Sequence, residues 1–83
     1  MQIRFVQNQI FAHLQELILD EYGNYVVSHV IEFGLHQDKE YIVKEIIDQV
    51  ISLSLHKFGS NVLEKCLFFA PEKERVQVLD KII

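Results

Sequence analysis

The chain has 83 residues, of which 49% are hydrophobic, and it contains only 3 glycines and 1 proline. This length allows at most one small domain, and the composition excludes a disordered chain and favours a compact, helix-rich one. The net charge of −4 excludes indiscriminate binding to phosphate, so a nucleic-acid partner would require a local binding face.

Neither a membrane span nor a secretory signal is expected from the sequence. The wholly apolar runs are only a few residues long, and a transmembrane helix needs about 20 apolar residues. Met1 to Arg4 lack the basic-then-apolar order of a signal peptide. Cys66 is the only cysteine and lies among apolar neighbours, which fits a reducing compartment. We therefore expect a cytoplasmic protein with no membrane partner.

The first half of the chain predicts two helices. The first is amphipathic, because its apolar residues recur at spacings of three and four: Phe5, Val6, Ile10, Leu14, Leu17 and Ile18. Gly23 breaks the pattern, Asn24 opens a second helix through about Phe33, and Gly34 closes it, as glycine commonly does at a helix C-terminus.

The second half repeats this order. A unit beginning near Asp38 has apolar residues at helical spacing, namely Ile42, Ile46, Val50 and Leu53. A further helix follows Gly59 and ends near Ala70-Pro71. A last helix is predicted with Val76, Leu79 and Ile83 on one stripe. The sequence thus predicts a single all-α array of two helix-pair repeats (1–36 and 37–72) and the first helix of another (73–83).

A direct comparison of two segments supports this repeat. Tyr22-Gly23 and Phe58-Gly59 begin similar ten-residue segments, and 58 minus 22 gives a period of 36 residues, typical of stacked helical repeats. Four apolar pairs keep their character: Val26/Val62, Val27/Leu63, Val30/Cys66 and Ile31/Leu67. Four other pairs differ and fall on one helix face: Asn24/Ser60, Tyr25/Asn61, Ser28/Glu64 and His29/Lys65. One face is therefore interpreted as scaffold and the other as a surface that binds something different in each repeat.

These two segments carry a resemblance to a known family. The stretches from Asp20 to Val27 and from His56 to Cys66 resemble the Pumilio (PUF) RNA-binding domain, in the order of the two repeats before its last one. The resemblance implies an armadillo-like α-solenoid of about eight repeats that binds single-stranded RNA at one base per repeat. It also implies binding to UGU-type elements of mRNA 3′-untranslated regions and regulation of translation or mRNA stability.

The resemblance also assigns roles to residues of this chain. Asn24 with Ser28, and Ser60 with Glu64, are the implied base-edge contacts, and Tyr25 and Asn61 the implied stacking side chains. A Glu64 carboxylate can accept hydrogen bonds from guanine N1–H and N2–H. The family usually has Gln where Ser28 stands, so the uracil preference of the first repeat is left open. The candidates for phosphate contact are Lys57, Lys65 and His29, although lysines in such positions more often face solvent.

Simpler explanations exist for several of these residues. Asn24 and Ser60 each follow a glycine and could act as helix N-caps. Tyr25 could belong to the core. The outer carboxylates are interpreted as a solvated face: Glu40, Glu45, Asp48, Glu72 and Glu74. A protein-interaction module of the HEAT or armadillo kind, with these acidic helices docking a basic partner, is the main alternative function, and a nucleolar pre-rRNA-binding relative is another.

An enzyme, a metal site and a cofactor are not expected. The four histidines, His13, His29, His36 and His56, lack metal-ligand spacing, and Cys66 is interpreted as a core residue. No phosphate-binding glycine loop or nucleophile motif occurs. The chain ends on Ile82-Ile83 without a polar capping repeat, so we expect its repeat ends to contact the remaining repeats of a longer domain or a second copy. Protein co-regulators are further possible partners.

Overall fold

The computed structural model describes residues 11–82 and contains only helices in that range. The all-α prediction is therefore confirmed. None of the helices in this range is both long and apolar enough to cross a membrane. The predicted apolar positions Phe5, Val6, Ile10 and Ile83 lie outside the described residues. In order, the elements are α2 (Leu14–Ile18), α3 (Gly23–Phe33), α4 (His36–Ile46), the 3₁₀ helix η1 (Ile47–Gln49), α5 (Val50–Ser54), α6 (Gly59–Phe69) and α7 (Glu72–Ile82).

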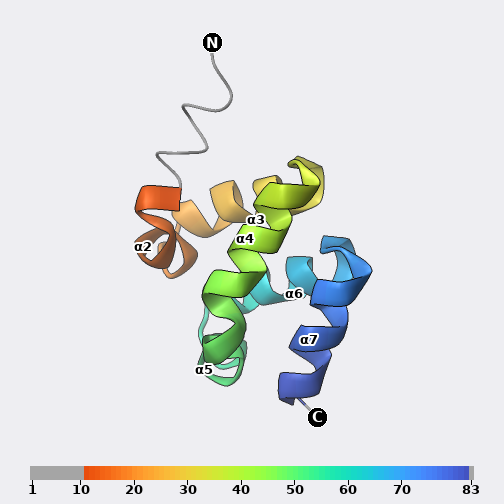
Figure 1. Cartoon of the computed structure of the whole chain (residues 1–83). Helices are drawn as coiled ribbons and strands as arrows, with labels where there is room; N and C mark the ends of the chain where they lie inside the picture. Colours follow the sequence, from red (N-terminus) through yellow and green to blue (C-terminus); the bar gives the residue numbers. More distant parts are fainter. Residues whose placement is uncertain (1–10, 83) are drawn as a thin grey trace.

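The helices form two layers that stack along the 36-residue period. The second helices of the two repeats, α3 and α6, pack on each other, and this is the most extensive helix–helix contact among the described elements. The α4–η1–α5 segment and α7 form the other layer and also contact each other. In Figure 1, α4 and α7 lie in front, and α3 and α6 lie behind them. This is the arrangement of an α-solenoid, as predicted.

The helix following Gly34 differs from the prediction in its start and its continuity. It begins at His36 rather than near Asp38, and the backbone departs from α-helical values at Ile46 (φ −102°, ψ −7°) and Gln49 (φ −115°, ψ 13°). A single predicted pattern is thereby divided into α4, η1 and α5. All four predicted apolar residues, Ile42, Ile46, Val50 and Leu53, are nonetheless buried.

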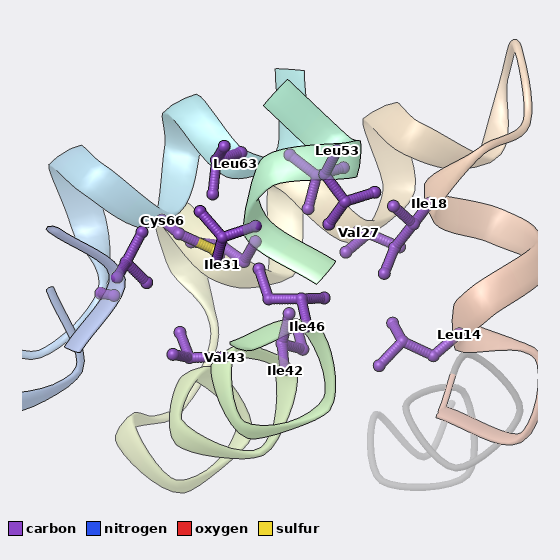
Figure 2. Close-up of a cluster of buried hydrophobic side chains, with 14 of the residues drawn as sticks. Leu14, Ile18, Val27, Ile31, Ile42, Val43, Ile46, Leu53, Leu63 and Cys66 are labelled. Carbon is purple, nitrogen blue, oxygen red and sulfur yellow. The ribbon is translucent and has the colours of Figure 1, made fainter. Parts of the chain in front are cut away.

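One hydrophobic core connects the layers. Figure 2 shows side chains from α2, α3, α4, α5 and α6 converging on it, with Ile31 and Cys66 among the labelled residues. The predicted scaffold pairs lie in or against this core with one exception. Val62 is fully buried, whereas its counterpart Val26 is 43% exposed. The exception shows that equivalent positions in two repeats do not have equivalent neighbours.

The predicted apolar stripe of the last helix is wrong. Val76 and Leu79 are 49% and 43% exposed, whereas Val78 is completely buried. Helix α7 contacts α4, η1, α5 and α6, and Val78 points toward them. Ile42, which lies 36 residues earlier and is also fully buried, marks the same position in the preceding repeat. The period therefore identifies the buried residue of α7 better than its local apolar spacing does.

The predicted helix ends at Gly34 and Ala70 are confirmed. Gly34 follows α3 and Ala70 follows α6, and their N–H groups donate to Val30 O and Cys66 O. Both residues have extended backbone angles, and no residue in the described range has a positive φ. The helices therefore end without the left-handed glycine common at helix C-termini.

Candidate nucleic-acid interface

The two helices of interest, α3 and α6, begin in the same kind of turn. Asp20 Oδ2 accepts hydrogen bonds from the backbone N–H groups of Tyr22 (2.8 Å) and Gly23 (2.7 Å). These bonds lower the pKa of the Asp20 carboxyl below its ordinary value of 3.8, with Gly23 the larger cause. In the second repeat, His56 Nδ1 accepts from the N–H groups of Phe58 and Gly59, both at 3.0 Å. Asp20 and His56 thus fix the start of each helix.

The alternative role of Asn24 and Ser60 as N-caps is wrong. The N-cap positions are Tyr22 and Phe58, and Asn24 and Ser60 are already the second residues of their helices. The free backbone N–H groups that a cap would satisfy are taken by the side chains of Asp20 and His56. The sequence signal for these caps was the 36-residue spacing of Asp20 and His56.

Asn24 is completely buried, and its carboxamide is engaged by protein groups. Its Nδ2 donates to the carbonyl oxygens of Asp20 and Glu21, both at 2.9 Å. Its Oδ1 accepts from Asn61 Nδ2 at 3.3 Å, across the contact between α3 and α6. In this closed arrangement Asn24 offers no free N–H group to a base, and only Oδ1 has remaining acceptor capacity.

The other predicted residues of α3 divide into a buried and an exposed pair. Ser28, one turn after Asn24, is 6% exposed, and its hydroxyl has no hydrogen-bond partner among the described residues. Tyr25 is 66% exposed, which rules out the alternative that it belongs to the core. His29 is also exposed, and its ring packs against Phe33 with centroids 4.9 Å apart. Tyr25 thus presents an open aromatic face, while the edge pair is covered.

The predicted residues of α6 are more accessible. Glu64 is exposed, and the half-buried Ser60 lies one turn before it. The Ser60 hydroxyl donates a long hydrogen bond of 3.4 Å to Lys57 O, and the Glu64 carboxylate makes no hydrogen bond or ion pair within residues 11–82. Asn61 is half-buried by its contact with Asn24. Of the two predicted edge pairs, only Ser60 and Glu64 are open to a ligand in this structure.

The two candidate phosphate-binding lysines differ in whether a carboxylate already pairs with them. Lys57 is exposed, with Nζ 5.4 Å from the centroid of the Phe58 ring. Lys65 Nζ lies 2.6 Å from Glu32 Oε1 and 5.2 Å from the centroid of the Phe69 ring. Lys57 can therefore reach a phosphate directly, whereas Lys65 is paired with a carboxylate of the neighbouring repeat.

Cys66 has a structural place in the core. Cys66 is fully buried, and burial raises the pKa of its thiol to about 12, which keeps it protonated and unreactive. This agrees with its predicted place in the core. The histidines, acidic residues and cysteine between residues 11 and 82 form no group of three that could hold a metal ion.

Comparison with known sequences identifies the repeat. The sequence pattern of the Pumilio-family RNA-binding repeat matches residues 13–47 and 49–83, which is most of the chain. The chain belongs to the Pumilio family.

Several Pumilio proteins are similar over most of the chain. A Pumilio domain-containing protein of Schizosaccharomyces pombe is 35% identical over 82 residues, covering 99% of this chain and 12% of that protein. Pumilio homolog 1 of Xenopus laevis is 44% identical over 73 residues, covering 88% of this chain and 6% of that protein. Fem-3 mRNA-binding factor 1 of Caenorhabditis elegans is 34% identical over 70 residues, covering 82% and 11%. The chain therefore spans only a small part of these relatives.

Within the Pumilio repeats, one residue of this interface was missed by the sequence analysis. Glu32 lies two turns after Asn24 on α3 and pairs with Lys65 across the repeat boundary. At the equivalent position 36 residues later stands Phe68, so the internal comparison gave no signal for an acidic group there. Only the packing of α3 on α6 brings Glu32 and Lys65 together.

Proposed function

We propose that this chain binds single-stranded RNA through the exposed sides of α3 and α6, at one base per repeat. The proposal is supported by its membership of a family of RNA-binding repeats and by a similar protein whose name describes an mRNA-binding factor. The observation that carries it is the pair Ser60 and Glu64, one turn apart on α6, with an exposed and unpaired carboxylate. A solvated carboxylate beside a hydroxyl suits the two donors on a guanine edge.

The first repeat reads its base differently in this proposal. The N–H groups of Asn24 are occupied by backbone carbonyls, so its Oδ1 is the group left to accept from a base. The Ser28 hydroxyl has no partner among the described residues, so it is free to donate to a carbonyl oxygen of the same base. An acceptor beside a donor suits the N3–H and carbonyl groups of uracil. Contact requires the Asn61 side chain to leave Asn24, which places Asn61 between the two bases beside exposed Tyr25.

The predicted ligand is the sequence 5′-GU-3′ within a UGU element, with RNA running antiparallel to the repeats. Lys57 and His29 are exposed and supply candidate contacts to the phosphates. A cytoplasmic role in regulating the translation or stability of mRNA belongs to this proposal as well.

Magnitudes limit the affinity of two repeats. Stacking contributes about 1–3 kcal/mol per base and an edge hydrogen bond about 0.5–1.5 kcal/mol. Two bases therefore provide about 5–8 kcal/mol, against an association cost of about 4 kcal/mol or more. We expect the 83-residue chain to bind a UGU oligonucleotide with a Kd no tighter than about 100 µM. Nanomolar binding would contradict this estimate.

The deciding experiment compares three RNAs and two proteins. NMR titration of the wild-type chain with oligonucleotides containing UGU, UAU and UCU should give the tightest binding for UGU. Glu64→Gln replaces an acceptor-only carboxylate with an amide and should remove most of the preference for guanine. Glu45→Gln on α4 makes the same change of charge on an exposed outer position and should keep the preference. Equal binding of all three RNAs by the wild-type chain would contradict the proposal.

The protein-interaction alternative is less well supported. It requires acidic outer helices that dock a basic partner, but the groove between α4 and α7 is lined by both charges. Its lining includes Glu40 and Lys44 on α4 and Lys73 and Glu74 on α7. Under this alternative, Glu45→Gln would impair function and Glu64→Gln would not, so the same pair of variants distinguishes the two proposals.

A further inference from the structure

The contact between α3 and α6 contains a line of polar side chains, which we call the α3–α6 seam: Asn24, Ser28 and Glu32 from α3, with Asn61 and Lys65 from α6. The three α3 residues follow one another at intervals of four, so they lie on one helix face. Two interactions close the seam, one on either side of Ser28 along α3. The Asn61–Asn24 hydrogen bond of 3.3 Å lies at one end and the Lys65–Glu32 ion pair of 2.6 Å at the other.

Ser28 lies between these two closures. The residue is 6% exposed, and its hydroxyl has no hydrogen-bond partner among the described residues. A buried polar group without a partner is unfavourable, and such groups in native proteins call for an explanation. The missing partner is explained if the seam opens and a ligand forms a hydrogen bond with Ser28.

The ion pair with Glu32 engages Lys65, a cation in the proposed RNA interface. Lys65 Nζ donates to the Glu32 carboxylate at a distance typical of a charge-assisted hydrogen bond. The lysine side chain is 40% exposed and the glutamate 24%, so both can be reached from solvent. A phosphate oxygen presents the same chemistry as a carboxylate oxygen to an ammonium group. Glu32 and an RNA phosphate therefore require the same donor.

We propose that Glu32 is an intramolecular competitor for RNA phosphate: it holds Lys65 in the closed α3–α6 seam and weakens RNA binding. This inference rests on the proposed function and extends it, because it assigns a role to a residue that contacts no RNA itself. Binding transfers Lys65 from Glu32 to phosphate and Asn61 from Asn24 to the space between the bases. The two transfers together uncover Ser28.

The test uses the complete chain and a short UGU oligonucleotide as the probe. Glu32→Gln removes the competing charge while keeping the side-chain length. The ion pair is partly exposed, and ion pairs in contact with solvent contribute little to stability, so the variant should fold. Breaking such an ion pair reduces a binding constant by a factor of about 1.5–5. The affinity of Glu32→Gln for RNA at low salt should therefore exceed that of the Glu45→Gln control by this factor. Salt also weakens the competing Glu32–Lys65 pair, so the affinity of the wild-type chain should fall less with salt than that of Glu32→Gln. The slope of log K against log salt should therefore be steeper in Glu32→Gln, by at most about 0.7, the contribution of one phosphate contact.

Two additional measurements locate the effect at Lys65. Adding Lys65→Met to Glu32→Gln should abolish the gain in affinity and return the salt slope to that of Lys65→Met alone. Without RNA, an amine-acylating reagent followed by mass spectrometry should modify Lys65 faster in Glu32→Gln than in the wild-type chain. The rate at Lys57, which is exposed and pairs with no carboxylate in the described residues, should stay constant.

Each outcome separates this inference from the proposed function. RNA binding with the same affinity and salt slope in Glu32→Gln and Glu45→Gln would overturn the competition while leaving the proposed function intact. An unchanged acylation rate at Lys65 would overturn it as well, because the pair would then not restrain the lysine in solution. If no variant binds RNA, the proposed function fails together with the competition.

Discussion

His56 takes the place of Asp20 in the second repeat: the two residues are 36 positions apart, and each accepts hydrogen bonds from two consecutive backbone N–H groups. The acceptors differ chemically, because one is a carboxylate oxygen and the other is the Nδ1 lone pair of an imidazole. Only an imidazole without a proton on Nδ1 can accept. The start of α6 therefore depends on the tautomer of a histidine, whereas the start of α3 depends on a charge.

Replacing His56 tests this equivalence. His56→Ala removes the acceptor for Phe58 and Gly59 and should lower the free energy of unfolding by about 0.5–2 kcal/mol, the usual effect of losing a cap. For a chain of this size, each 1 kcal/mol shifts Tm by about 4–8 °C. His56→Asp should recover most of that loss, because Asp20 already fills the same role. Thermal unfolding followed by circular dichroism measures both, with His13→Ala, at an exposed position, as the control. Equal Tm values for His56→Ala and His56→Asp would contradict the equivalence.

Asp20 should make the free energy of unfolding depend on pH in the acidic range. The Gly23 and Tyr22 N–H groups stabilise its ionised form and lower its pKa in the folded chain below 3.8. The folded state thus binds this proton less readily than the unfolded state. The contribution of Asp20 is fully present above about pH 3.8 and is lost as pH falls through the lower folded-state pKa. Urea unfolding between pH 2.5 and 6 should give a shallower pH dependence for Asp20→Asn than for the wild-type chain. The exposed Asp48→Asn substitution is the control for a changed net charge, and identical slopes for all three proteins would refute the assignment.

Sequence patterns predicted the helices that follow Asp20 and His56 but not the contacts between the repeats. The bounds of α3 and α6 follow from local signals, namely a glycine at the first position of each helix and Gly34 or Ala70-Pro71 after it. The hydrogen bond from Asn61 to Asn24 joins residues 37 positions apart. It depends on how far one helix is rotated against the next, which spacing within one helix does not determine. Val26 is likewise exposed and Val62 buried, although the two residues occupy the same position of the repeat. The sequence therefore predicted the two helices correctly, while the accessibility of the candidate site residues on them required the packing.

The two glycines that open the helices should respond differently to alanine. A Cβ at Gly23 would lie 2.8 Å from Leu17 O and 2.9 Å from Leu17 Cα, which are backbone atoms that cannot move alone. A Cβ at Gly59 would lie 2.8 Å from Leu53 Cδ2, the end of a flexible side chain. We expect Gly23→Ala to destabilise the chain by about 1–3 kcal/mol, as overpacking does. Gly59→Ala should change stability by less than about 1 kcal/mol, because the higher helix propensity of alanine offsets the adjustment of Leu53.

The measurement for this pair is urea unfolding of both variants under the same conditions, with the slope m checked for a change in the unfolded state. The Gly59→Ala variant serves as the control for the general effect of adding a methyl group at the start of a helix. A larger loss for Gly59→Ala than for Gly23→Ala would show that the backbone of Leu17 is not the rigid neighbour at this site.

Lys39 joins the C-terminal ends of the two helices that form the candidate interface. Its Nζ donates to Glu32 O of α3 at 3.5 Å and to Phe69 O of α6 at 3.4 Å. A cation at a helix C-terminus is stabilising because the last carbonyl groups lack partners and carry the negative end of the helix dipole. One lysine thereby serves two helices from consecutive repeats and fixes their relative position. Lys39→Met keeps most of the side-chain stem but removes the charge, and it should lower stability by about 1 kcal/mol. The control is Lys44→Met, which removes an exposed cation from the last turn of α4 alone. A larger loss in Lys39→Met therefore measures the bridge between α3 and α6 and not the general effect of a cation at a helix C-terminus.

Hydrogen exchange distinguishes a loss of this bridge from a general loss of stability. The N–H groups of Gly34 and Ala70 close the last turns of α3 and α6 by donating to Val30 O and Cys66 O. In Lys39→Met both amides should exchange faster than in Lys44→Met, while amides at the starts of α3 and α6 should be affected less. Faster exchange at only one of the two ends would mean that Lys39 stabilises a single helix. In that case the positions of α3 and α6 relative to each other would depend on the packing of their apolar faces, and the seam between them would open without any contribution from Lys39.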